Sequence, residues 1–154
     1  MGAPVQNREA IAGQWLERVL RTHPGFLGEE PDPFRNPVVY TLRESLRVLL
    51  DELLLDMDAR RVSAALDAIV QIRAVQDFAP GRALEFLFQL KDILREHPPG
   101  RDLNLLDSRI DQLVLEAFDT YVKYREKTFE ARANEVRRRV YLLERAAAAR
   151  RGEA

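Results

Sequence analysis

The stretch that decides the fold runs from Leu103 to Arg150 and reads LNLLDSRIDQLVLEAFDTYVKYREKTFEARANEVRRRVYLLERAAAAR. Proline and glycine are absent from Arg101 to Arg151, and the residue types that lose least on entering a helix dominate. At about 1.5 Å per residue, such a helix spans roughly 70 Å, whereas a compact domain of this chain length is roughly 40 Å across. We therefore expect one end of the helix to leave the domain or to pack along a partner.

Apolar side chains divide this long helix into two stripes. The first is bulky and should pack on the body of the protein; it consists of Ile110, Val114, Ala117, Tyr121, Tyr124 and Thr128. The second, which we call the seam, recurs at alternating spacings of four and three residues, as in a coiled coil. The seam consists of Phe129, Ala133, Val136, Val140, Leu143 and Ala147.

The switch from one stripe to the other is explained most simply by a change of partner, from the helix's own body to the same helix of a second chain. The sequence therefore predicts a helical body over residues 8–128 and an extended dimerisation part over residues 129–151. We expect a parallel homodimer. The alternative is a long helix packed wholly within its own bundle.

Four shorter helices are predicted before the long one, at about Arg8–Thr22, Pro37–Leu55, Ala59–Val75 and Pro80–Glu96. Apolar residues recur in them with the period of a helix that faces a core. Asn36 and Asp58 are residue types that cap helix N-termini, and Pro suits a first helical position. The helix from Pro80 is apolar over a wide arc that includes Phe88, so we expect it to be the central one. With no strand-like alternation, the prediction is an all-α fold of five helices.

Composition excludes several classes of protein. The 154 residues suit one domain, and the absence of cysteine excludes disulfides, thiolate nucleophiles and iron–sulfur clusters. No apolar run approaches a membrane span and the N-terminus does not resemble a signal peptide, so we expect a cytoplasmic protein without a membrane partner. The net charge is −1, but residues 132–154 carry seven arginines against three glutamates. The body is mildly acidic and the end of the long helix is basic.

The residue types that catalysis requires are sparse. The two histidines, His23 and His97, each precede a proline at a helix end, so we expect no metal site and no haem. The serines lie in predicted helices without a neighbouring base, and there is no glycine-rich phosphate loop. The sequence therefore predicts no catalytic residues, no cofactor and no enzymatic activity.

One polar pair stands within an apolar stretch: Arg73 and Asp77 are four residues apart in IRAVQDF. Buried charges are usually paired, because an unpaired buried charge is costly. The simpler interpretation is a structural ion pair or a helix cap. The alternative is the polar lining of a small ligand pocket, shared with Arg35, Tyr40, Tyr121 and Tyr124.

The arginine run Arg137–Arg139 could contact phosphates. Glu135 and Glu144 flank the run and few aromatic residues accompany it, so the electrostatic footprint is weak. We therefore do not expect nucleic-acid binding.

Several short sequence segments resemble those of one protein family. They are Trp15-Leu16 with Thr22-His23-Pro24, Asp32-Pro33-Phe34-Arg35-Asn36-Pro37, Ile72-Arg73-Ala74-Val75-Gln76-Asp77-Phe78-Ala79-Pro80, and Tyr124-Arg125-Glu126-Lys127 followed by Arg132-Ala133-Asn134-Glu135-Val136-Arg137-Arg138. Together they resemble the N-terminal sensor domain of the RsbT co-antagonist (RsbRD-type) proteins of bacterial stressosomes. The resemblance covers roughly residues 8–146.

The resemblance implies an all-helical input domain of the non-haem globin-like kind, which dimerises and passes a signal through its last helix to a regulatory protein or domain. It makes residues 8–128 the sensor body and residues 129–151 the signalling part. The regulatory domain and its phosphorylated residues do not lie within this chain. The alternative function is a stand-alone ligand-binding or adaptor protein that contacts a partner through its basic last helix.

Overall fold

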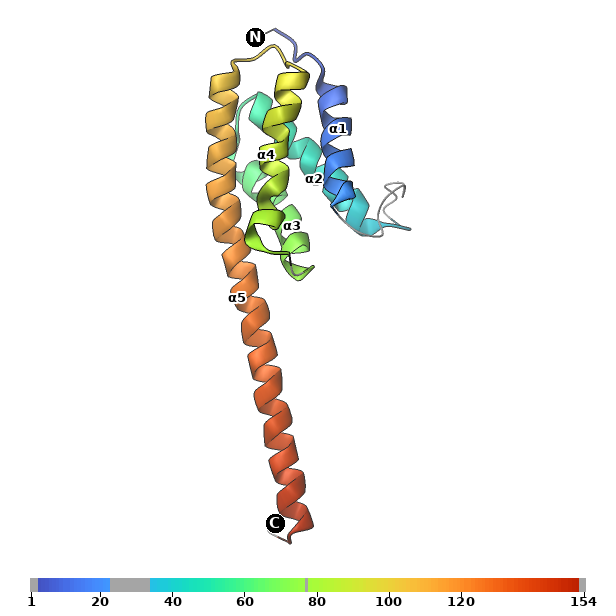
Figure 1. The fold of residues 1–154 in the computed structure, drawn as a ribbon, viewed down its shortest axis with the longest axis vertical. Helices are drawn as coiled ribbons and strands as arrows, with labels where there is room; N and C mark the ends of the chain where they lie inside the picture. The colour runs from blue at the N-terminus through green and yellow to red at the C-terminus, as the bar shows by residue number, and fades with distance from the viewer. Residues whose placement is uncertain (1–2, 23–33, 77, 153–154) are drawn as a thin grey trace.

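The computed structural model describes residues 3–22, 34–76 and 78–152, and these form an all-α fold of five helices (Figure 1). The helices are α1 (Arg8–Arg21), α2 (Pro37–Leu54), α3 (Ala59–Val75), α4 (Pro80–Glu96) and α5 (Leu103–Arg150). No strand occurs in the described ranges. The predicted fold class is therefore confirmed, and α1 and α2 each end one residue earlier than expected.

The capping residues act at the helix starts as their types predict. The side chain of Asn36 accepts a hydrogen bond from the backbone N–H of Val39, and Asp58 accepts one from the N–H of Arg61. Asp102 accepts from the N–H of Asn104 at the start of α5. These bonds satisfy donors that the first turn of a helix leaves free, so α2, α3 and α5 each begin directly after a capping side chain.

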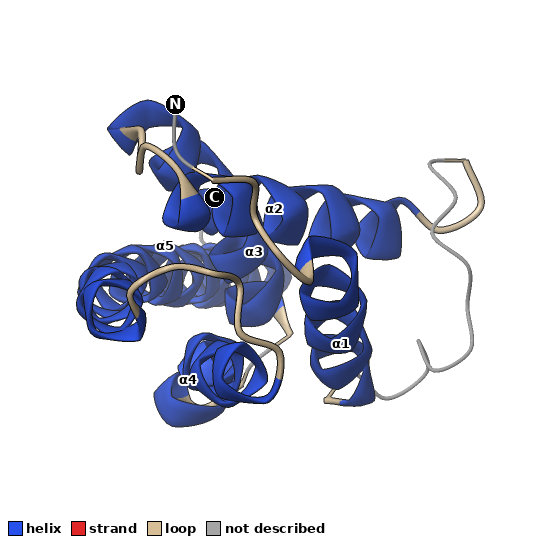
Figure 2. Ribbon diagram, turned by 90° about the horizontal axis from the view of Figure 1, so that it is seen from above, coloured by secondary structure: helices blue, strands red, loops and turns tan. Residues whose placement is uncertain are grey.

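The body is a bundle in which α2, α3 and α4 lie beside the first half of α5, and α1 packs against α2 and α4 (Figure 1). Seen along the long axis, α3 lies at the centre, with α2 and α4 on opposite sides and α5 alongside (Figure 2). The core contains Trp15, whose indole N–H donates to the carbonyl oxygen of Phe86 at 2.8 Å. Their rings stack with centroids 6.1 Å apart.

The expectation that the helix from Pro80 is the central one was wrong. Phe88 belongs to its apolar arc but is 50% exposed, and the ammonium group of Lys91 lies 5.9 Å from the centre of its ring. Lys91 in turn pairs with Asp111 of α5 at 2.7 Å. The central helix α3 presents small buried side chains, Ala65 and Ala74, and small side chains allow neighbouring helices to approach closely.

The long helix changes its surroundings along its length. Within the body it buries Leu106, Ile110, Leu113, Ala117 and Tyr121. Val114 and Tyr124 of the predicted first stripe are partly buried against the core, and Thr128 is half-buried. Beyond this point α5 continues away from the body as a single helix (Figure 1).

Candidate functional site

The seam lies on the part of α5 that leaves the body. Phe129 is 75% exposed, Val136, Val140 and Leu143 are also exposed, and Ala133 and Ala147 are half-buried. Isolated apolar side chains are common on protein surfaces, but a continuous apolar face is typical of an interaction site. The structure thus brings the six predicted seam residues onto one helix without covering their face.

The same face of α5 continues toward the N-terminus of the helix, into the part that packs on the body. Leu115, Val122, Phe129, Val136 and Leu143 follow one another at intervals of seven residues. Positions seven apart drift by only about 20° around a helix, so these five side chains share one side of α5. Leu115 is 70% exposed, and Val122 is half-buried. Sequence reasoning missed Leu115 and Val122, although the seven-residue interval was a signal that could have found them.

Three of the arginines at the end of the helix have partners along the helix itself. Arg139 pairs with Glu135 at 2.7 Å, and Arg137 donates to the side-chain oxygen of Asn134 at 3.2 Å. The guanidinium of Arg145 lies 5.9 Å from the centre of the Tyr141 ring. Such contacts are ordinary features of an exposed helix surface.

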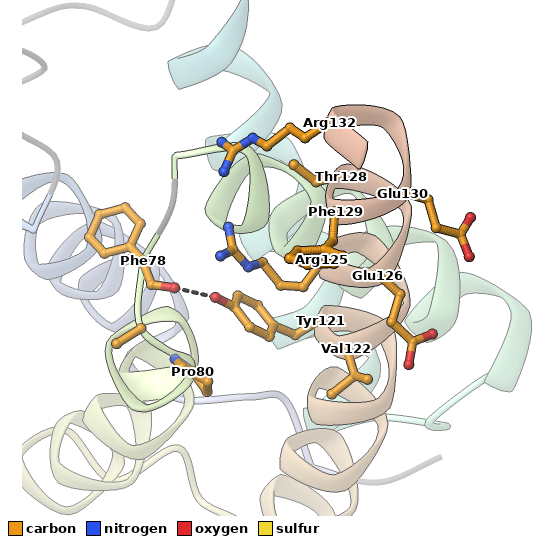
Figure 3. A pocket seen from close by; sticks show the side chains of 11 residues that line it. Phe78, Pro80, Tyr121, Val122, Arg125, Glu126, Thr128, Phe129, Glu130 and Arg132 are labelled. Atoms are coloured by element: carbon orange, nitrogen blue, oxygen red, sulfur yellow. Dashed lines mark hydrogen bonds between the residues drawn. The ribbon is translucent and has the colours of Figure 1, made fainter. Parts of the chain in front are cut away.

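A pocket of about 750 Å³ lies where α5 leaves the body. One wall is formed by Phe78, Ala79 and Pro80 at the start of α4. The other is the stretch of α5 from Tyr121 to Arg132. The hydroxyl of Tyr121 donates a hydrogen bond to the carbonyl oxygen of Phe78 and so joins the two walls (Figure 3).

The basic and acidic side chains around this pocket point in different directions. Arg125 and Arg132 extend from α5 toward the wall that contains Phe78, whereas Glu126 and Glu130 point to the other side of the helix (Figure 3). The side of α5 that faces the pocket is therefore basic.

Arg73 is a buried cation, only 1% exposed. It donates to the hydroxyl oxygen of Thr22 at 2.9 Å, and its guanidinium carbon lies 5.1 Å from the ring centre of Phe78 and 5.9 Å from that of Phe86. Burial lowers the pKa of Arg73 to about 10, an effect that Glu85 opposes.

The position of Arg73 explains how its charge is tolerated. Thr22 is the C-cap residue of α1, so its bond from Arg73 places the guanidinium at the carbonyl end of that helix, where a cation is favourable. Its Nε has no hydrogen-bond partner in the described structure. Asp77, its expected partner, lies outside the described residues, so the ion pair stays a prediction.

The structure does not bring the other predicted pocket residues together. Tyr40 is a partly exposed residue of α2, and Arg35 precedes that helix. Tyr124 turns toward α3, where its hydroxyl donates to Asp67 at 2.8 Å. Tyr121 lies three residues earlier on α5 and faces the start of α4 instead. Among the described members of the predicted set, it alone lines the pocket.

The described residues contain no group of three or more His, Cys, Asp or Glu side chains arranged to hold a metal ion. None of the described helices is both long and apolar enough to cross a bilayer.

The helical body, the pocket where α5 leaves it and the uncovered face of α5 define the class of protein, which is an all-helical module with one long projecting helix. More particularly, the chain belongs to the family of the RsbT co-antagonist protein rsbRD N-terminal domain, whose family model matches residues 9–136. An uncharacterized protein of Archaeoglobus fulgidus is 26% identical over 134 residues, which cover 84% of each chain. No solved structure matches this chain.

Proposed function

We propose that this chain is a non-enzymatic, cytoplasmic signalling module that forms a parallel homodimer through the seam. The family supports a stressosome-like signalling role. The observation that carries the dimer proposal is the uncovered apolar face of α5, which begins in the body at Leu115 and continues to Ala147. A helix with such a face is stabilised when a second helix covers it.

Charge supports the parallel direction. In a parallel coiled coil, a residue that flanks the seam meets the residue five positions later on the other helix. This rule pairs Arg125 with Glu130 and Arg139 with Glu144, which attract, and Arg132 with Arg137, which repel. The symmetry of the dimer repeats each of these pairs, so the dimer contains twice as many attractive pairs as repulsive ones.

The signalling mechanism follows from the continuity of α5. An input at the body would favour one of two packings of the seam, by rotating or separating the two helices, and the far ends would report that choice. A regulatory protein that contacts the far ends is the downstream partner in this proposal.

Light scattering after size-exclusion chromatography tests the dimer. We expect twice the chain mass at tens of micromolar for the native protein and the monomer mass for Val140→Glu, because two carboxylates would enter an apolar seam. Leu142→Glu is the matched control, since Leu142 is exposed on the same helix outside the seam. A monomeric native protein contradicts the dimer, and an unchanged mass for Val140→Glu contradicts the seam.

A further inference from the structure

The pocket at the exit of α5 has the dimensions and apolar walls of a small-molecule site. Its volume of about 750 Å³ lies within the range of ligand pockets, roughly 300–1,000 Å³. Phe78 and Pro80 form one side, and Val122 and Phe129 contribute from α5. These side chains offer apolar and aromatic contacts to the body of a ligand.

The polar groups of the pocket belong mainly to one side of α5. Tyr121, Arg125, Thr128 and Arg132 follow one another at spacings of four, three and four residues, which places them on one helix face. Thr128 uses its hydroxyl to donate to the carbonyl oxygen of Tyr124, so this proton is already used within the helix.

The charges select the class of ligand. Glu126 and Glu130 also border the pocket but point to the other side of α5, whereas both arginines extend over the apolar wall (Figure 3). Within the described part of the chain, Arg132 forms no ion pair. Guanidinium groups bind carboxylates with charge-assisted hydrogen bonds.

We propose that this pocket binds a free monocarboxylate with an apolar tail, such as a medium-chain fatty acid. Arg132 binds the carboxylate, and the tail lies against Phe78, Pro80 and Phe129. The ligand needs only one carboxylate group, which Arg132 binds. Arg125 lies seven residues earlier, roughly 10 Å along the helix, and is too far away to bind the same group.

The location of the pocket gives binding a consequence for the long helix. Tyr121 is the last buried residue of α5, and its hydrogen bond to Phe78 closes the inner end of the pocket. A ligand between these walls therefore contacts both the body and the first turn of the projecting helix. Binding itself does not require a dimer, whereas an effect on the seam rests on the proposed function.

Isothermal titration calorimetry of the full chain with decanoate tests the site. We expect one decanoate per chain and about tenfold weaker binding of decanol, which has the same tail without the charge. Decylamine, with the opposite charge, should not bind. Vesicles of phosphatidylglycerol should not retain the chain, because the pocket admits a single small molecule.

Two surface substitutions locate the site. Arg132→Gln should weaken decanoate binding about tenfold, while its control Arg138→Gln, an exposed arginine of the same helix outside the pocket, should leave it unchanged. Ala79→Trp should abolish binding by filling the pocket from an exposed position outside the core. Equal binding of decanoate and decylamine, or full binding by Ala79→Trp, overturns the proposal.

These experiments distinguish a failure of the ligand proposal from a failure of the dimer proposal. Val140→Glu should bind decanoate as the native chain does, because Val140 lies outside the pocket. If decanoate gives no heat and Ala79→Trp instead changes the mass of the native assembly, the pocket belongs to an interface between copies and the ligand proposal is wrong. Retention on vesicles without binding of free decanoate overturns it in favour of a membrane surface.

Discussion

The hydroxyl of Tyr121 donates a hydrogen bond to the carbonyl oxygen of Phe78, and the ring of Phe78 covers the buried guanidinium of Arg73. Phe78 therefore contacts the buried cation with its side chain and the long helix with its backbone. Through this one residue the interior of the body is connected to the point where α5 leaves it.

Tyr121→Phe tests this connection by removing one hydroxyl group. The Phe78 carbonyl would lose its side-chain donor, so we expect the free energy of unfolding to fall by about 1 kcal/mol. Urea denaturation measures the loss. Tyr141→Phe is the control, because Tyr141 is exposed on the projecting part of α5 and should change nothing. Equal stabilities of the native protein and Tyr121→Phe would show that the bond does not contribute.

Substitutions of Arg73 separate the contribution of its volume from that of its charge. Arg73→Ala would leave a cavity between Phe78 and Phe86 and should cost about 3 kcal/mol. Arg73→Met keeps most of the volume and removes the cost of burying a cation, so its stability should lie within about 1 kcal/mol of the native value. Urea denaturation distinguishes the two. A loss for Arg73→Met as large as that for Arg73→Ala would show that the charge itself is required.

The hydrogen bond from Tyr124 to Asp67 predicts a change at high pH. Burial and Asp67 both raise the pKa of Tyr124 above its ordinary value of 10. Because the folded state binds this proton more tightly than the unfolded state, the bond stabilises the fold below about pH 10 and is lost as the pH rises through the raised pKa.

Ultraviolet absorbance of the tyrosinate measures this titration, as the difference between the native protein and Tyr124→Phe. Asp67→Asn should move the midpoint back toward 10, since an amide carries no charge to oppose tyrosinate formation. An unchanged midpoint in Asp67→Asn would assign the shift to burial alone.

Leu115→Glu tests whether the dimer interface begins inside the body. If the face from Leu115 to Leu143 is one interface, this change should weaken dimerisation at least tenfold, as measured by sedimentation equilibrium. Leu105→Glu provides the control, because Leu105 is an exposed leucine of α5 outside the seven-residue series. Equal dissociation constants for both variants would restrict the interface to the projecting part of the helix.

The helices were predictable because their signals are local. Pro37, Asp58 and Pro80 mark starts that depend on a few neighbouring residues, and the absence of Pro and Gly fixes the length of α5. The first stripe of α5 was predictable for the same reason, because helical spacing alone decides which side chains share a face.

The arrangement of the helices was less accessible from the sequence. The exposure of Phe88 depends on which side of α4 meets α5, and sequence periodicity cannot set that rotation when the apolar arc is wide. The pocket was missed because its walls, Pro80 and Phe129, are far apart in the sequence. Tyr121 and Tyr124 look equivalent on the helix, yet one reaches Phe78 and the other Asp67.

The unbroken course of α5 makes it a lever. From Tyr121 to Arg150 the helix extends roughly 44 Å beyond its last buried side chain. A tilt of about 5° at Tyr121 would displace Arg150 by about 4 Å, so a sub-ångström rearrangement at Phe78 becomes a several-ångström movement at the far end. The length of α5 thus amplifies a small change of its tilt at Tyr121. A distance probe near Arg150 would detect a movement that is too small to resolve with a probe inside the body.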